Sequence, residues 1–170
     1  TIVTGSVREL CAAAAEACNA LGYMPYILTD SLNCKAREAG AFLAAIARAH
    51  QNTDRSLAFL AGGETVVHLT GSGMGGRNQE LALSAAEGIA GLRDTAVFSI
   101  GSDGTDGPTD AAGGFVTGQT KDDLGKKGIQ IFDVLKNNDS YHALKLCDGL
   151  LHTGATGTNV NDVAVLLIRR

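Results

Sequence analysis

Arginine, aspartate and small polar residues gather in three glycine-rich loops of this 170-residue chain. The loops span residues 71–80, 101–110 and 154–162, and each adjoins a short apolar run typical of a strand. Glycine lets a backbone approach a ligand closely or adopt positive φ, and loops of this kind on a strand–helix scaffold often carry binding sites. The arginine, the carboxylates, the hydroxyls and the backbone N–H groups favour a site for an anionic ligand, with or without a metal.

The first loop fits two phosphate-binding patterns by residue count. Gly71-x-Gly73-x-x-Gly76 has the spacing of a dinucleotide fingerprint, but Asp103 follows Gly76 by 27 residues and stands past the strand end where a ribose-binding carboxylate is expected. A P-loop spacing also fits, but Arg77 occupies the lysine position. We reject both motifs. The loop still has the groups that bind an anion in such motifs, namely backbone N–H groups, a helix N-terminus and a planar guanidinium. The alternative is a flexible connection with Arg77 in a surface salt bridge.

Three aspartates recur in the second loop, at positions 103, 106 and 110. They could hold magnesium, act as a base toward a hydroxyl or cap turns and helices, and the spacing differs from that of a calcium-binding hand. Asp103 directly follows the strand predicted over residues 96–100, where sites of α/β proteins form. Asp103 is therefore the first candidate for a functional residue. Asp103 and Asp106 are the candidates for binding a metal, whereas Asp110 is interpreted as a helix cap.

The third loop brings a small polar cluster of Thr156, Thr158, Asn159, Asn161 and Asp162. These side chains could line a pocket or hold one another in Asx and Ser/Thr turns. Residues 137–140, Asn-Asn-Asp-Ser, have a helix cap as their default interpretation. The chain has no G-x-S-x-G elbow, which disfavours a hydrolytic triad.

Composition excludes several classes of protein. A net charge of −4, the lack of a basic run, and aromatic residues at 5% without tryptophan argue against a nucleic-acid partner. Four cysteines lack zinc spacing and read as buried, reduced thiols. No signal-peptide pattern and no apolar stretch of membrane-spanning length occur. We expect a cytoplasmic protein without membrane association.

Apolar periodicity predicts an α/β fold. Residues 1–50 read strand–helix–strand–helix, a Rossmann-like pattern, with a first strand at 2–4 and a helix capped by Ser6 and Glu9 and ended by Gly22. Further strands are expected at 57–60, 64–70, 95–100 and 163–168, the first two as a hairpin, with helices at 78–90, 120–127, 130–136 and 139–147. The pattern predicts a layered α/β/α architecture with a mixed sheet, and we place a boundary that separates a segment 1–54 from a domain 55–170.

The loop sequences resemble those of a known family when taken in order. They are GSGMGGRNQELAL at 71–83, GSDGTDGPTDAAG at 101–113, NNDSY at 137–141 and TGATGTNVND at 153–162. This set is similar to the C-terminal MOFRL domain of the glycerate 2-kinases, proteins also labelled hydroxypyruvate reductases. The resemblance covers residues 56–168, and residues 1–50 resemble more loosely the segment that precedes that domain. It implies that residues 1–54 form the end of a larger N-terminal domain and that residues 55–170 form the C-terminal domain.

The resemblance implies a kinase that phosphorylates the 2-hydroxyl of D-glycerate with ATP and Mg²⁺. Its site lies in a cleft between this domain and a larger N-terminal domain that carries a catalytic lysine, so this chain is expected to be inactive alone. By motif, Arg77 would bind phosphoryl oxygens, and Asp103 would hold magnesium or orient the attacking hydroxyl. Substrate- or nucleotide-binding candidates are Glu64, Gly73, Gly75, Gly76, Asn78, Thr156 and Asn159.

Two other functions stay open from the sequence. The chain could be a stand-alone module that binds an anion or a nucleotide without turnover. It could also be an NAD(P)-dependent hydroxypyruvate reductase, although the missing ribose-binding carboxylate speaks against this. The expected partners are D-glycerate, a nucleotide and the N-terminal domain of the same protein, and a homodimer is allowed.

Overall fold

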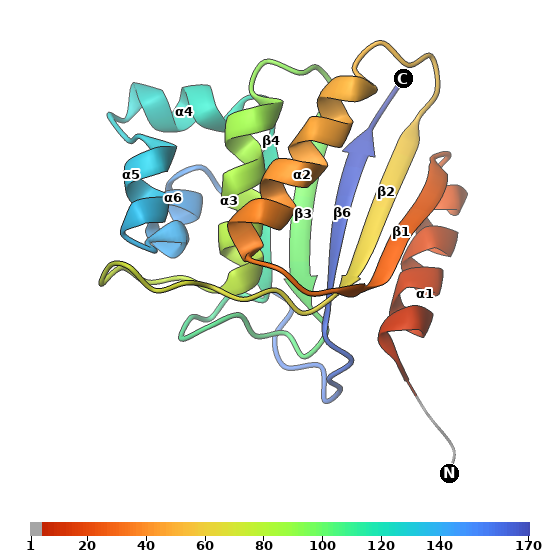
Figure 1. Cartoon of the computed structure of the whole chain (residues 1–170), viewed down its shortest axis with the longest axis horizontal. Coiled ribbons are helices and arrows are strands. Elements are labelled where there is room, and N and C mark those ends of the chain that lie inside the picture. Colours follow the sequence, from red (N-terminus) through yellow and green to blue (C-terminus); the bar gives the residue numbers. More distant parts are fainter. Residues whose placement is uncertain (1–4) are drawn as a thin grey trace.

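A computed structural model describes residues 5–170 and shows one twisted sheet with helices on both faces (Figure 1). The helices and strands follow one another in this order: α1 (Val7–Ala20), β1 (Met24–Leu32), α2 (Ala36–Ala49), β2 (Leu57–Gly63), α3 (Arg77–Ile89), β3 (Thr95–Gly101), β4 (Gly113–Thr117), α4 (Thr120–Lys126), α5 (Ile131–Lys136), α6 (Ser140–Leu146), β5 (Leu150–Leu151) and β6 (Asp162–Ile168).

The six strands form a mixed sheet in the order β1-β2-β6-β3-β4-β5. Only β1 and β2 pair in parallel, and every other neighbouring pair is antiparallel. The last strand of the chain, β6, is therefore inserted between β2 and β3. Because β2 and β3 both run opposite to β6, their carboxyl ends meet the start of β6 at one edge of the sheet, the lower edge in Figure 1.

Helices cover the two faces of the sheet unequally. α2 and α3 pack on each other over one face, in a core that includes Leu43, Leu81, Ile89 and Leu166. On the other face α1 covers β1 and β2, and Cys11 packs near Leu60. The predicted α/β/α layering with a mixed sheet is thus confirmed.

The start of α1 has the expected capping interaction. The backbone N–H of Glu9 donates to Oγ of Ser6 at 3.2 Å, and the chain leaves the helix through Gly22, whose φ is +86°. Burial raises the pKa values of the Cys11 and Cys18 thiols, which keeps both neutral. The strand expected at residues 2–4 lies outside the described residues.

The hairpin expected from strands 57–60 and 64–70 is wrong. β2 runs to Gly63, and the chain then continues beside residues 32–36 instead of folding back: Glu64 N–H donates to the Leu32 carbonyl and Val66 N–H to the Cys34 carbonyl. Among the described residues, the only β-bridge that residues 64–70 make is a single parallel one between Lys35 and Val66. Residues 64–76, here called the arm, therefore cross the end of the sheet without regular secondary structure.

The division proposed at residue 54 stays a prediction. β1 from the first segment pairs with β2 from the second, and α2 packs along α3, so the two segments share one sheet and one core. Among residues 5–170, no helix is both long and apolar enough to cross a membrane.

Candidate functional site

Sheet register places Asp162 at the centre of the site. As the first residue of β6, it pairs with Gly63 at the end of β2 on one side and with Gly101 at the end of β3 on the other. Glu64 follows Gly63 directly, and Asp103 follows Gly101 by two residues. Three carboxylates from three loops are thus brought to one edge of the sheet by strand pairing alone.

Arg77 begins α3 above these carboxylates. Its Nε and Nη2 donate to the two carboxylate oxygens of Asp162 at 2.5 and 3.1 Å, and its Nη1 donates to Glu64 Oε1 at 2.9 Å. Three of the five N–H groups of a guanidinium are therefore used, which leaves two for a ligand. The hydrogen bond to Asp162 is the main reason that the pKa of Arg77 is raised, so the side chain stays charged.

The two acidic partners of Arg77 differ in exposure. The Asp162 side chain is 8% exposed and forms a bidentate pair with the guanidinium, whereas Glu64 is 53% exposed and holds it through one oxygen. Asp162 fixes the orientation of Arg77 from below. Glu64 is the partner that an incoming anion could displace, because water already solvates it.

Asp103 stands at the end of β3 with a half-buried carboxylate. Its Oδ1 accepts from Thr105 N–H at 2.9 Å, and its Oδ2 lies 3.5 Å from Asn159 Nδ2. The second and third loops also meet through their backbones, because Thr156 N–H donates to the Asp103 carbonyl. The contact with Asn159 is long, so Oδ2 of Asp103 retains the capacity to bind a cation or a hydroxyl.

Asp106 has a different role, although it lies only three residues further on. It is 3% exposed, and its two oxygens accept the backbone N–H groups of Asn78 and Gln79 at 3.1 and 2.9 Å. This is the capping contact that α3 needs at its N-terminus, made by a distant side chain. Its carboxylate also neutralises the positive end of the helix. The geometry leaves Asp103 as the better metal candidate of the two.

Five consecutive N–H groups in the first part of the glycine loop are not available to a ligand. The N–H groups of residues 70–74 donate instead to residues 137–139: Thr70 and Gly71 to Asn138 Oδ1, Ser72 to Asn137 Oδ1, Gly73 to the Asn137 carbonyl and Met74 to Asp139 Oδ1. The prediction that these groups face a ligand is wrong, because this distant segment already uses them.

The glycines of this loop are required by close packing. A Cβ at Gly71 would lie 2.4 Å from Asn137 Cα, one at Gly73 2.4 Å from Asp139 Cβ, and one at Gly76 2.2 Å from Asp106 Cγ. Real Cβ atoms do not approach so closely, so larger residues would separate the two segments. The glycine pattern thus records a close contact within the protein.

Arg77 and Asp103 line the same cavity, of about 700 Å³. The arm and the second and third loops form its walls, and Pro108 and Leu69 add apolar surface. Of the residues predicted to bind substrate or nucleotide, those that line it are Glu64, Gly73, Gly75, Gly76 and Asn159.

Two predicted binding residues lie outside this cavity lining. Asn78 is buried between Asp106 and Ser99, whose hydroxyl donates to Asn78 Oδ1 at 2.5 Å. Thr156 donates its hydroxyl to the Ser102 carbonyl at 2.5 Å and so joins the third loop to the second. Both side chains shape the loops that carry the lining residues.

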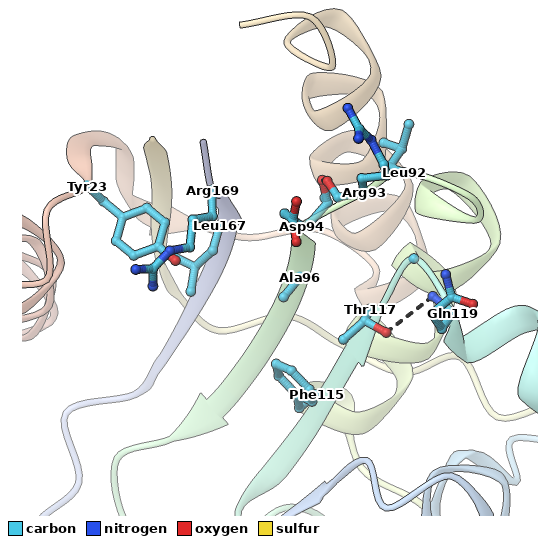
Figure 2. Close-up of a pocket in the computed structure, with 12 residues that line it drawn as sticks. Tyr23, Leu92, Arg93, Asp94, Ala96, Phe115, Thr117, Gln119, Leu167 and Arg169 are labelled. Carbon is cyan, nitrogen blue, oxygen red and sulfur yellow. Dashed lines mark hydrogen bonds between the residues drawn. The ribbon is translucent and has the colours of Figure 1, made fainter. Parts of the chain in front are cut away.

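A second cavity, of about 590 Å³, lies at the opposite end of the sheet (Figure 2). Phe115, Ala96 and Leu167 give it an apolar floor, with Arg169 and Asp94 near its rim. It contains none of the residues predicted to do chemistry, so we place the functional site at the first cavity.

Sequence reasoning missed two parts of this site. Asp162 was seen only as a member of a polar cluster, although a carboxylate that opens a central strand could have been matched with Arg77. The segment 137–140 was read as a helix cap. Asp139 does precede α6, but its carboxylate accepts from Met74 N–H and contacts His142 Nδ1 at 2.6 Å.

The residues present fit a magnesium ion whose ligands come mainly from bound phosphates and water, with one carboxylate from the protein. Among residues 5–170, no group of three or more His, Cys, Asp or Glu side chains could hold a metal ion by itself. Mg²⁺ is commonly bound by one or two carboxylates together with substrate phosphates and water. Asp103, with a free oxygen beside the cavity, suits that mode.

The fold and the site together define an α/β domain with a cavity at the carboxyl ends of two strands, lined by both Arg77 and Asp103. Residues 57–162 match the MOFRL family. The chain belongs to the MOFRL family.

Solved and curated relatives agree in sequence and fold. The chain is 51% identical over 168 residues to a protein of Thermotoga maritima named D-glycerate 2-kinase, covering 96% of this chain and 40% of that protein. It is 44% identical to a glycerate 2-kinase of Pyrococcus horikoshii, covering 93% of this chain and 37% of that protein. The crystal structure of a glycerate kinase from Thermotoga maritima superposes with a TM-score of 0.93 at 51% identity, over 96% of this chain and 41% of that one. The chain thus spans about two fifths of the length of these relatives.

Proposed function

We propose that this chain is the C-terminal part of a glycerate 2-kinase that transfers the γ-phosphoryl group of ATP to the 2-hydroxyl of D-glycerate. The observation that carries the proposal is the shared cavity of Arg77 and Asp103, in a chain 51% identical to a protein named D-glycerate 2-kinase. Phosphoryl transfer requires mainly positioning and charge stabilisation, and the cavity offers a guanidinium and a carboxylate for those tasks.

Arg77 would bind the phosphoryl oxygens. Its bidentate pair with Asp162 fixes the plane of the guanidinium, and the two remaining N–H groups are available for oxygens of a transferring phosphate. Displacing Glu64 would release a third N–H. The guanidinium would then offer its largest number of donors when the phosphoryl group is present.

Asp103 would act at the other side of the cavity. Its carboxylate would hold Mg²⁺ or orient the attacking hydroxyl of D-glycerate, with Asn159 beside it. A bound Mg²⁺ would neutralise charge on the phosphates. Thr105 N–H donates a hydrogen bond to Oδ1 of Asp103 and so fixes the carboxylate, which leaves Oδ2 for this work.

We further propose that the chain needs an N-terminal domain for turnover. The resemblance to the family implies a catalytic lysine on such a domain and an active site in the cleft between the two. That the relatives are about two and a half times as long supports this arrangement. The cavity at one sheet edge would then be one wall of the cleft.

Glycerate-dependent ADP release by the full-length protein tests the proposal. We expect ADP release that requires D-glycerate and a divalent cation, with phosphorus NMR placing the new phosphate on the 2-hydroxyl, and no ADP release from the 170-residue chain alone. Oxidation of NADH or NADPH with hydroxypyruvate, in place of ADP release, would favour a reductase. Binding of ATP without turnover by the full-length protein would favour a binding module.

A further inference from the structure

The arm forms one wall of the cavity but has little structure of its own. It contains no helix or strand, and its Leu69 side chain is 77% exposed. Glu64, Val66, Gly73 and Gly76 of the arm all face the cavity. A segment with few packed side chains keeps a defined position only if hydrogen bonds hold its backbone.

The buried side chain of Asn138 supplies the central bonds of this kind. Its Oδ1 accepts from Thr70 N–H at 2.7 Å and Gly71 N–H at 2.9 Å. Its Nδ2 donates to the His68 carbonyl at 3.1 Å and to Glu80 Oε2 at 3.0 Å. One amide, 4% exposed, thus bonds three residues of the arm, at positions 68, 70 and 71, and connects them to α3.

Glu80 anchors that amide to the core. Its side chain is 3% exposed, and Arg37 of α2 donates to Oε1 at 2.8 Å while Asn138 donates to Oε2. Nη2 of Arg37 also donates to the Leu135 carbonyl in α5 at 2.5 Å. The buried polar groups of this network are paired, so its geometry is well determined.

We propose that Asn138 is a positioning residue, which holds residues 68–71 of the arm over the cavity and thereby sets the place of the glycines before Arg77. For catalysis this inference rests on the proposed function. Loss of the amide would leave the arm mobile, so ligands would have to order it when they bind, and their affinity would fall.

The backbone at Asn138 permits a clean substitution. Its φ is +56°, in the left-handed region that glycine adopts without strain. Asn138→Gly therefore removes the side-chain bonds and leaves the backbone path intact. Asn137→Ala is a matched control in the same segment: Asn137 is exposed, and its side chain makes one contact, from Ser72 N–H at 3.2 Å.

Amide hydrogen exchange measured on the 170-residue chain tests the positioning role without reference to activity. We expect Asn138→Gly to speed exchange in the arm about tenfold relative to β6, because two or more buried hydrogen bonds are lost. Asn137→Ala should leave the ratio of arm to β6 exchange within about twofold. Equal acceleration of arm and β6 by Asn138→Gly would overturn the proposal, because the residue would then be only a general stabiliser.

A complementary pair of substitutions gives the second test. Asn138→Asp places a carboxylate against Glu80, and adding Glu80→Gln restores one donor and one acceptor between the two positions. We expect the double variant to have slower arm exchange than Asn138→Asp alone, which a merely structural effect at either site would not produce. Exchange in the double variant as fast as the sum of both single effects would contradict the proposal.

Kinetics of the full-length protein then connects the arm to catalysis. Asn138→Gly should raise the KM for D-glycerate or ATP about tenfold and leave kcat within about threefold. An unchanged KM together with a mobile arm would refute the catalytic part of the inference. A wild-type protein without kinase activity would refute the proposed function instead, and the exchange result would still decide the role of Asn138.

Discussion

Two arginine–carboxylate pairs are connected to the arm and look alike in chemistry, one through Asn138 and one through Glu64. Arg37 pairs with Glu80, and Arg77 pairs with Asp162; each arginine side chain is 33% exposed, and each of these carboxylates is less than 10% exposed. The difference is in the remaining partners. Arg37 donates further to the Leu135 carbonyl, which is fixed, whereas Arg77 donates to Glu64, which is exposed and faces a cavity. The two arginines are equally exposed, so burial does not distinguish them. What distinguishes the arginine that can bind a ligand from the structural one is an exposed acidic partner beside a cavity.

The largest expected effect separates the two arginines by turnover. Arg77→Lys keeps the charge but loses the fork that pairs with Asp162 and contacts phosphoryl oxygens, so we expect kcat of the full-length protein to fall about a hundredfold or more. Steady-state ADP release checks this. Arg77→Ala is a poorer variant, because it would leave Asp162 buried without its cation. Turnover of Arg77→Lys within threefold of wild type would remove Arg77 from the mechanism.

The second effect is on stability and concerns the other pair. Arg37→Met leaves the carboxylate of Glu80 buried beside Asn138 with no cation, and we expect the free energy of unfolding to fall by about 2–3 kcal/mol. Urea unfolding of the 170-residue chain measures it. For the full-length protein, kcat per folded molecule should stay within about threefold, since Arg37 does not line the cavity. A drop in kcat as large as that expected for Arg77→Lys would contradict the distinction between a binding arginine and a structural one.

The smallest effect is a difference in pH dependence between two aspartates of the second loop. Burial raises the pKa of Asp106, against the opposing hydrogen bonds from Gln79 and Asn78. A raised pKa means that the folded protein holds this proton more tightly than the unfolded chain. The contribution of Asp106 to the free energy of unfolding is therefore present at low pH and is lost as pH rises through the raised pKa. We therefore expect the stability advantage of wild type over Asp106→Asn to shrink as pH rises above the ordinary aspartate pKa of about 4.

Asp110 serves as the control for this titration. The hydrogen bond that Tyr141 donates to it lowers the pKa of Asp110, so its contribution is present above the ordinary pKa and is lost as pH falls through the lowered value. The wild-type advantage over Asp110→Asn should therefore decrease in the acid direction, opposite to Asp106. Urea unfolding at pH values both below and above about 4, the ordinary aspartate pKa, measures both, and slopes of the same sign would show that the assignment at Asp106 is wrong.

Local sequence rules predicted the parts of the fold that depend on neighbouring residues. The cap at Ser6, the helix end at Gly22 and the strand after residue 95 follow from side chains within a few positions. The hairpin after Gly63 failed because the apolar run at 64–70 resembles a strand, while its hydrogen-bond partners lie at 32–36 and 136–138. Pairing between distant segments is not encoded in the period of one segment.

The sequence predicted which residues gather at the site better than it predicted what each of them does there. Arg77 and Asp103 were chosen because an arginine at a helix start and an aspartate after a strand suit an anion site, and both line the cavity. Asp106 has the same residue type and the same glycine-rich surroundings, yet it caps α3. The glycines that suggested a ligand cradle serve instead to seat residues 137–140. Only the arrangement in space separates these cases.

Turnover of Asp103→Asn and Asp106→Asn in the full-length protein, measured beside each variant's unfolding free energy, tests the central claim most directly. The account predicts that Asp103→Asn lowers kcat for D-glycerate phosphorylation about a hundredfold or more and changes stability by less than about 0.5 kcal/mol. It predicts that Asp106→Asn lowers stability by about 1–2 kcal/mol and keeps kcat per folded molecule within threefold. Near-normal turnover of Asp103→Asn would contradict the account.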